Sequence, residues 1–152
     1  MVDFVIKKKF QSMIDVTHFK HVIELVFAEM KIHPIPGISV LITDNKDIKS
    51  LNDQYLGVNQ PTDVLSFNNE YIEPDTGQKH LGDIAISYPF AQKQAEAGGN
   101  PVTQELELLL VHGCLHLLGF DHDSDVSQQK MWEIQKSILK QLNNPIQPVK
   151  IR

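Results

Sequence analysis

An apolar segment with three regularly spaced histidines constrains this chain more than any other feature of the sequence. The segment runs from Val111 to His122 and reads VHGCLHLLGFDH. His112 and His116 are four residues apart, so on a helix their side chains project from one face, one turn apart. Gly119 can end that helix in a left-handed turn and bring His122 back beside the other two. The spacing therefore predicts three imidazoles that converge near the end of a helix.

Three converging imidazoles predict a metal site. Catalytic zinc sites use three protein ligands and keep the fourth position open, whereas imidazoles buried without partners cost free energy. We therefore expect one Zn²⁺ per chain, bound by His112, His116 and His122, although nickel, copper or another divalent metal suits the same ligands. The metzincin proteases use the same spacing. Because Gly113 occupies the position of their general-base glutamate, a peptidase is disfavoured.

Two small residues lie between the first two histidines. Gly113 costs a helix about 1 kcal/mol relative to alanine, so we expect it to make room beside the metal or, alternatively, to permit close helix packing. The single cysteine, Cys114, excludes an internal disulfide and fits a reducing cytoplasm. Cys114 is expected on another side of the helix, as a small core residue.

Length and composition are those of one globular domain, which we expect to cover residues 1–152. The sequence has no run of about 18 apolar residues, so no membrane span is expected. Apolar residues precede the lysines at the N-terminus, which is the wrong order for a secretory signal. The net charge of −5 argues against indiscriminate nucleic-acid binding, which needs a basic face. We therefore expect a cytoplasmic protein.

Hydrophobic periodicity and turn residues predict an α+β domain with a small mixed sheet of about four strands. Strands are expected over residues 2–6, 38–43, 64–67 and 81–87, and residues 68–80 are expected to form a polar loop. Helices are expected over residues 18–31, 46–55, 89–97, from 101 into the histidine motif, and from 125 or 127 to 142. The helix that carries the histidines is apolar on most sides, so it should be the central buried helix. Asn100 is its expected N-cap, and Pro101 its first residue.

Three sequence blocks resemble the YbeY family of bacterial metal-dependent endoribonucleases. The blocks are the histidine motif, the segment Pro61–Phe67 (PTDVLSF) and the segment Gly82–Ile84 (GDI), and their resemblance covers the chain from about Leu51 to Leu139. It implies a cytoplasmic, zinc-binding hydrolase that cleaves single-stranded RNA in ribosomal RNA maturation and ribosome quality control. The implied partners are single-stranded RNA, ribosomal RNA and the ribosome, with neither a membrane nor DNA.

One position departs from the family pattern. The family usually has an arginine after the tyrosine of the preceding helix, and here Leu56 follows Tyr55. If Leu56 faces a cleft beside the metal site, binding of the RNA phosphate should be weaker than in the family. The alternative is that Leu56 belongs to the core. The loss of this cation, together with the acidic net charge, favours an alternative function, a non-catalytic ribosome-assembly factor with a structural zinc.

The general base is not evident from the sequence. Asp83 and Asp63 are the candidates, and Asp83 can equally cap a turn or hold a histidine in place. Thr62 and Ser66 either line the cleft or satisfy backbone groups. The attacking oxygen can come from water or from the neighbouring 2′-hydroxyl of the RNA, and the sequence does not distinguish the two.

Overall fold

The computed structural model describes residues 1–121 and 123–146, and its sheet has four strands. The strands are β1 (Val2–Ile6), β2 (Gly37–Thr43), β3 (Val64–Ile72) and β4 (Lys79–Ser87). The helices are the 3-10 helix η1 (Lys8–Met13), α1 (Val16–Glu29), α2 (Asn45–Leu56), α3 (Tyr88–Gly98), α4 (Val102–Leu117) and α5 (Asp125–Gln141). The sheet order is β1-β2-β4-β3, in which β3 alone is antiparallel to its neighbour and forms one edge. The predicted α+β class with a mixed sheet is confirmed.

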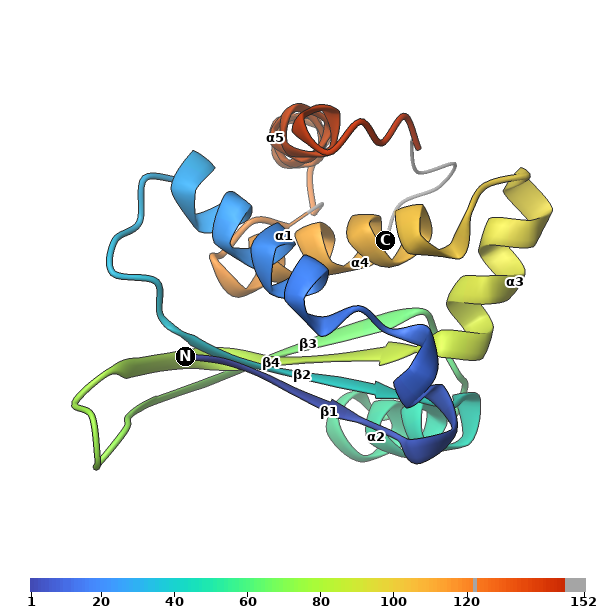
Figure 1. Ribbon diagram of the computed structural model, residues 1–152, viewed down its shortest axis with the longest axis horizontal. Helices are drawn as coiled ribbons and strands as arrows, with labels where there is room; N and C mark the ends of the chain where they lie inside the picture. The colour runs from blue at the N-terminus through green and yellow to red at the C-terminus, as the bar shows by residue number, and fades with distance from the viewer. Residues whose placement is uncertain (122, 147–152) are drawn as a thin grey trace.

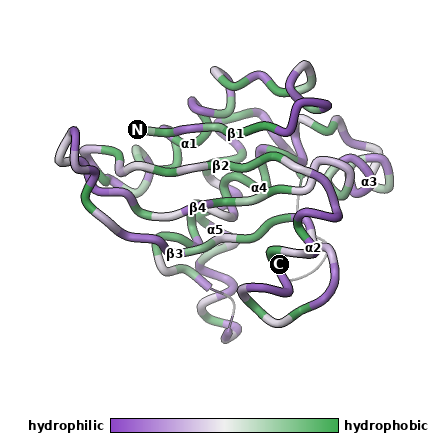
Figure 2. The backbone as a smooth tube through the Cα atoms, turned by 90° about the horizontal axis from the view of Figure 1, so that it is seen from below, coloured by the Kyte–Doolittle hydropathy of each residue, from purple (hydrophilic) through white to green (hydrophobic). Residues whose placement is uncertain are grey.

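The helices are distributed unequally over the two faces of the sheet. Helices α1, α3, α4 and α5 lie on one face, and α2 lies on the other (Figure 1). Helix α5 forms an outer layer, because it packs on α4 and α1. Seen from the side of α2, much of the sheet face has no helix in front of it (Figure 2). The candidate site lies at the β3 edge of the sheet, where residues of α2 and α4 line the same cavity.

Helix α4 occupies the centre of the core, as its sequence predicts. It packs against α1, α3, α5, β3 and β4, and all residues from Glu105 to Leu115 are buried. A helix that is apolar on most sides gains most when it is covered on every side. The neighbouring strand β2 is likewise buried along most of its length, as expected for a strand with parallel neighbours.

One carboxylate of α4 lies inside this core with its partners. Glu107 is buried and accepts from His18 Nε2 of α1 at 2.7 Å and from Asn144 Nδ2 at 3.0 Å. A buried charge without partners would lower the free energy of unfolding by roughly several kcal/mol. The contacts therefore satisfy Glu107 and join α1 and the segment after α5 to the central helix.

The segment expected to be a polar loop, residues 68–80, is largely a hairpin. Strand β3 continues to Ile72 and β4 begins at Lys79, with a bulge between Asn68 and Tyr71. Two backbone hydrogen bonds of 2.8 Å close the turn, from Glu73 N–H to the Gln78 carbonyl and from Gly77 N–H to the Glu73 carbonyl. Residues 68–72 are exposed, so the alternation that reveals a half-buried strand is missing from them.

The start of α4 also differs from the expectation. Pro101, not Asn100, is the N-cap residue of α4, and no side chain caps this end. The Pro101 carbonyl instead accepts from Gln104 N–H at 3.1 Å. The 3-10 helix η1 is not among the expected helices either.

Helix α2 begins at a charged cap. Asp44 accepts from Asp47 N–H at 3.0 Å and from Lys7 Nζ at 2.9 Å. The backbone hydrogen bond from Asp47, and then the Lys7 ammonium, lower the pKa of Asp44 to about 2. This cap ties α2 to the segment that follows β1.

Replacing Asp44 with alanine should lower the free energy of unfolding by about 1–2 kcal/mol at pH 7. The folded-state pKa of Asp44 is depressed, so its contribution is complete above about pH 4 and is lost as the pH falls toward 2. Urea titrations at several pH values measure this difference. Asp53→Ala, which removes the same charge from an exposed position of α2, is the control and should have little effect at any pH. A destabilisation by Asp44→Ala that stays constant down to pH 2 contradicts the assignment.

Candidate functional site

Two of the three predicted metal ligands face each other on α4. The Nε2 atoms of His112 and His116 are 2.9 Å apart, and the two rings meet edge to face with centroids 4.4 Å apart. His112 is 3% exposed, and His116 is partly buried. The four-residue spacing thus places both imidazoles on one side of the helix, as expected. His122, the third predicted ligand, lies outside the described residues.

Gln135 of α5 orients His112 through the ring nitrogen that does not face His116. His112 Nδ1 donates to Gln135 Oε1 at 3.1 Å, and Gln135 is 2% exposed. Because an amide oxygen only accepts, this hydrogen bond places the ring proton on Nδ1 and makes Nε2 the acceptor that faces His116. Sequence reasoning missed Gln135, since it lies 23 residues away in a helix with no motif of its own.

The donor atoms of the pair fit a metal ion. Two imidazoles bound to one tetrahedral zinc at about 2.0–2.1 Å would have their nitrogens roughly 3.3 Å apart, close to the 2.9 Å between these Nε2 atoms. A partner on the second ring nitrogen is also usual for a metal-binding histidine, and Gln135 provides it for His112. Among residues 1–121 and 123–146, no group of three or more histidine, cysteine or acidic side chains is gathered. The described part of the chain therefore contributes two nitrogen donors.

The small residues between the histidines serve packing. A Cβ atom on Gly113 would lie 3.1 Å from Ile84 Cδ1 and 3.2 Å from Ser66 Oγ. Gly113 thus permits close packing of α4 on β3 and β4, the alternative to our expectation that it makes room beside a metal. Cys114 is fully buried, and burial raises the pKa of its thiol to about 12. It is a core residue, as expected.

The paired histidines form part of the wall of a cavity of about 390 Å³ at the β3 edge of the sheet. We call it the histidine cavity. Its lining residues are Leu56, Thr62, Asp63, Val64, Leu65, Ser66, Asn68, His112, His116 and Leu117. The segment between α2 and β3 and the first part of β3 therefore border the histidines. No lysine or arginine is among these lining residues.

Leu56 faces this cavity. It is the last residue of α2, and its side chain is 61% exposed. The alternative that Leu56 belongs to the core is therefore wrong. Thr62 and Ser66 also line the cavity, and Ser66 Oγ donates to the Gly113 carbonyl at 3.2 Å.

The two aspartates considered as general bases lie in different places. Asp63 is buried at the histidine cavity, where its Oδ1 accepts from Val64 N–H at 2.7 Å. Asp83 is absent from the cavity lining and holds a histidine other than the pair, because its Oδ1 lies 3.0 Å from His80 Nε2. Its Oδ2 accepts from Asn69 Nδ2 at 3.1 Å. Of the two carboxylates, Asp63 is the one that borders the histidines.

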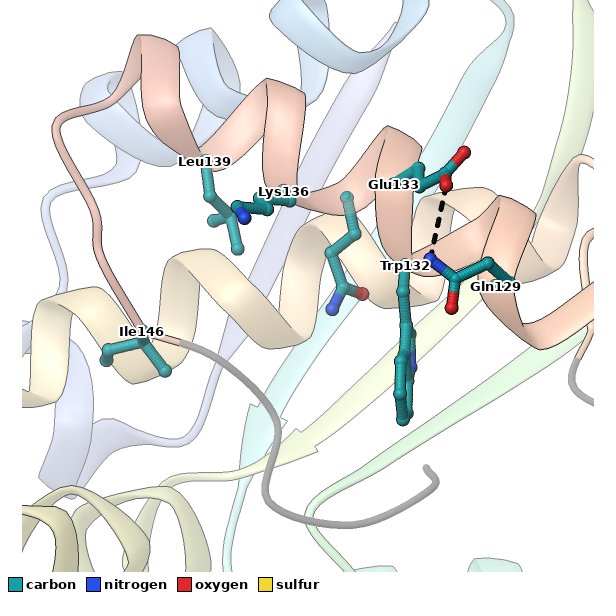
Figure 3. Close-up of a pocket in the computed structure, with 7 residues that line it drawn as sticks. Gln129, Trp132, Glu133, Lys136, Leu139 and Ile146 are labelled. Carbon is teal, nitrogen blue, oxygen red and sulfur yellow. Dashed lines mark hydrogen bonds between the residues drawn. The ribbon is translucent and has the colours of Figure 1, made fainter.

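A second cavity of about 390 Å³ lies along α5 (Figure 3). Gln135 forms part of its wall. Trp132 and Leu139 project from α5 in the same direction, and Gln129 Nε2 donates to Glu133 Oε1 at 3.1 Å. Neither His112 nor His116 lines this cavity. We therefore assign the candidate site to the histidine cavity, with Gln135 as the link between the two.

Replacing Gln135 with leucine should lower the free energy of unfolding by about 1–3 kcal/mol, because the buried His112 Nδ1–H loses this acceptor. Urea unfolding measures the change, and ¹⁵N spectra of the imidazoles show whether the Nδ1–H form of His112 becomes less populated. Gln129→Leu, on the exposed side of the same helix, is the matched control. A variant as stable as this control, with the same tautomer as the parent protein, would show that Gln135 does not orient His112.

Comparisons with known proteins identify the family of this chain. The family model for Endoribonuclease YbeY matches residues 5–143. Endoribonuclease YbeY of Persephonella marina is 40% identical to this chain over 126 residues, which are 82% of each chain. Endoribonuclease YbeY of Dehalococcoides mccartyi is 31% identical over 153 residues, which cover 93% of this chain and 89% of the relative. A solution structure of TM1509 from Thermotoga maritima matches with a TM-score of 0.58 and 26% identity over 99% of both chains. The chain therefore belongs to the YbeY family of endoribonucleases.

Proposed function

We propose that this protein is a zinc-dependent endoribonuclease that cleaves single-stranded RNA. The observation that carries the proposal is the pair of facing Nε2 atoms, 2.9 Å apart, in the wall of the histidine cavity. Membership of an endoribonuclease family supports RNA as the substrate. The acidic chain, with a net charge of −5, favours single strands over a broad duplex-binding mode.

In this proposal His112, His116 and His122 hold the metal. Zinc in such a site supplies Lewis-acid polarisation of a phosphoryl oxygen and acidifies water. The chain itself orients the site, because Gln135 keeps the proton of His112 on Nδ1 and leaves Nε2 as the donor atom. The backbone N–H of Val64 holds the Asp63 carboxylate at the cavity, where it can take up a proton released during cleavage.

The cavity lining indicates how RNA is held. Asn68 presents an amide that can donate to a phosphate oxygen. Thr62 and Ser66 present hydroxyl oxygens that can accept from a 2′-hydroxyl, because their own protons are donated to Asp63 Oδ1 and the Gly113 carbonyl. Because the lining residues include no lysine or arginine, phosphate binding depends on neutral donors and on the metal. This predicts a weak dependence of RNA binding on salt.

We further propose that the RNA is ribosomal and that the protein acts in its maturation and in ribosome quality control in the cytoplasm. The relatives are endoribonucleases by name, which supports endoribonuclease activity, and the ribosomal role extends the resemblance of the histidine and Pro61–Phe67 blocks. In the described part of the chain, no helix is long and apolar enough to cross a membrane.

A second candidate, a ribosome-assembly factor with a structural zinc, is favoured by the absence of cations from the cavity lining. The two functions differ in the fourth ligand of the metal. A structural zinc is closed by four protein ligands, whereas a catalytic zinc keeps one position for water or substrate. The histidine cavity, about 390 Å³ in volume, favours the catalytic form.

Replacing His116 with alanine should remove the metal, lower the melting temperature and abolish cleavage of single-stranded RNA. Metal binding to the folded protein is linked to folding, so its loss reduces stability. Elemental analysis should find about one equivalent of metal in the parent protein, and chelator should stop cleavage. His21→Ala, at an exposed position of α1, is the control and should retain both. Full metal content in His116→Ala, or cleavage by purified His112→Ala, would contradict the assignment.

Replacing Leu56 with arginine should raise the affinity for single-stranded RNA, because a guanidinium at the exposed end of α2 can bind phosphate bidentately. The slope of log affinity against log salt should steepen by about 0.7 for each added phosphate contact. Fluorescence anisotropy at several salt concentrations measures both quantities. Val58→Arg is the control, because Val58 is exposed near Leu56 but does not line the histidine cavity. If Leu56→Arg leaves the salt slope unchanged and lowers the melting temperature, Leu56 does not contact RNA at the histidine cavity.

A further inference from the structure

A large groove lies on the sheet face that carries α2. Its volume is about 840 Å³, and we call it the sheet groove. It is lined by Val5, Ser39, Val40, Leu41, Leu51, Tyr55, Leu56, Ser66, Phe67, Asn68, Asn69, Asp83, Ile84 and Ala85. Helix α2 covers only one end of this face, where β2 and β4 terminate (Figures 1 and 2), so the central strands form the floor beside it.

The sheet groove adjoins the histidine cavity. Leu56, Ser66 and Asn68 line both. The cavity reaches α4 on one face of the sheet, and the groove extends beneath the other face from the same β3 edge. Because the two share these three residues, an RNA strand with a phosphate beside the histidines can place a neighbouring nucleotide at the sheet groove.

The chemistry of the groove suits an uncharged, planar group. Tyr55 is 59% exposed, and its ring centroid is 5.0 Å from that of Phe67 at an interplanar angle of 51°. Exposed aromatic rings are the usual stacking surfaces for the bases of single-stranded RNA. The amides of Asn68 and Asn69 add hydrogen-bonding groups at the rim.

The charges of the groove argue against phosphate as its occupant. No lysine or arginine is among the lining residues, and the single carboxylate among them, Asp83, is bound by His80 and Asn69. A phosphate in this groove would meet a negative charge with no cation to offset it. The walls instead present exposed apolar surface, such as Val5, which is 62% exposed, and a base would cover such surface.

We propose that the sheet groove is a nucleobase-binding subsite, in which a base adjacent to the scissile phosphate stacks on Tyr55, with Phe67 supporting the tyrosine ring. The inference rests on the proposed function and deepens it, because it assigns base contacts to the sheet groove and phosphate contacts to the histidine cavity. Recognition by stacking tolerates every base, so the subsite confers affinity and position along the strand with little sequence preference.

Single abasic substitutions test the subsite. Fluorescently labelled single-stranded RNAs, each with one abasic position around the mapped cleavage point, are assayed with the metal-loaded protein for affinity and for kcat and KM. One abasic position should weaken binding by the parent protein, and Tyr55→Ala should weaken binding of intact RNA by a similar factor, about 5- to 150-fold. The loss should appear in KM more than in kcat. Tyr55→Ala should bind the intact RNA and the RNA with that abasic position with the same affinity.

Two further variants complete the design. Tyr55→Phe keeps the ring and should retain the affinity. Tyr71→Ala is the matched control, because Tyr71 is also an exposed tyrosine in contact with another ring, that of His80, but it does not line the sheet groove. Melting temperatures show whether each variant is folded.

The outcomes separate the subsite from the proposed function. If the parent protein binds and cleaves RNA but Tyr55→Ala keeps its affinity and its response to the abasic position, the subsite is wrong and the nuclease proposal stands. An equal loss in Tyr71→Ala also overturns the subsite. If the parent protein neither binds nor cleaves any of the RNAs, the proposed function fails, and the subsite fails with it.

Discussion

Burial of α4 on every side is the constraint on which the rest of this structure depends. A helix with so much apolar surface must be covered by the sheet below, by α1 and α3 at its sides and by α5 above. The polar groups that it carries inward then need partners, because unpaired buried polar groups are costly. Glu107 finds them in His18 and Asn144, and His112 finds one in Gln135.

The same burial that stabilises the fold also prepares the site. His112 is held by α5 on one side and meets His116 on the other, so its ring is fixed before any ligand arrives. Gly113 lets α4 approach Ile84 and Ser66 closely, and this closeness sets the histidines against the first residues of β3. The open underside of the sheet, which α2 covers only at one end, then supplies a path away from the histidines.

Elements with buried faces could be predicted from the sequence, and elements without them could not. The parallel strands and the apolar stripe of α1 follow from residues that alternate or recur with a regular period. The outer half of the β3–β4 hairpin escaped prediction because residues 68–72 are exposed, and their pairing depends on the partner strand. The N-terminus of α4 was misplaced at Asn100 because proline is common in the first turn, whereas here Pro101 is itself the N-cap residue.

The sequence by itself determined that His112 and His116 share one face of a central helix, because a four-residue spacing on a helix permits nothing else. It also determined the α+β class, through the order and period of the apolar segments. Only the tertiary structure decided that Gln135 orients His112, that Asp83 holds His80 instead, and that Leu56 faces a cavity. These contacts join elements that are distant in the chain, or they lie beside a strand bulge, as the contact of Asp83 with His80 does. Local periodicity carries no information about which side chains such packing brings together.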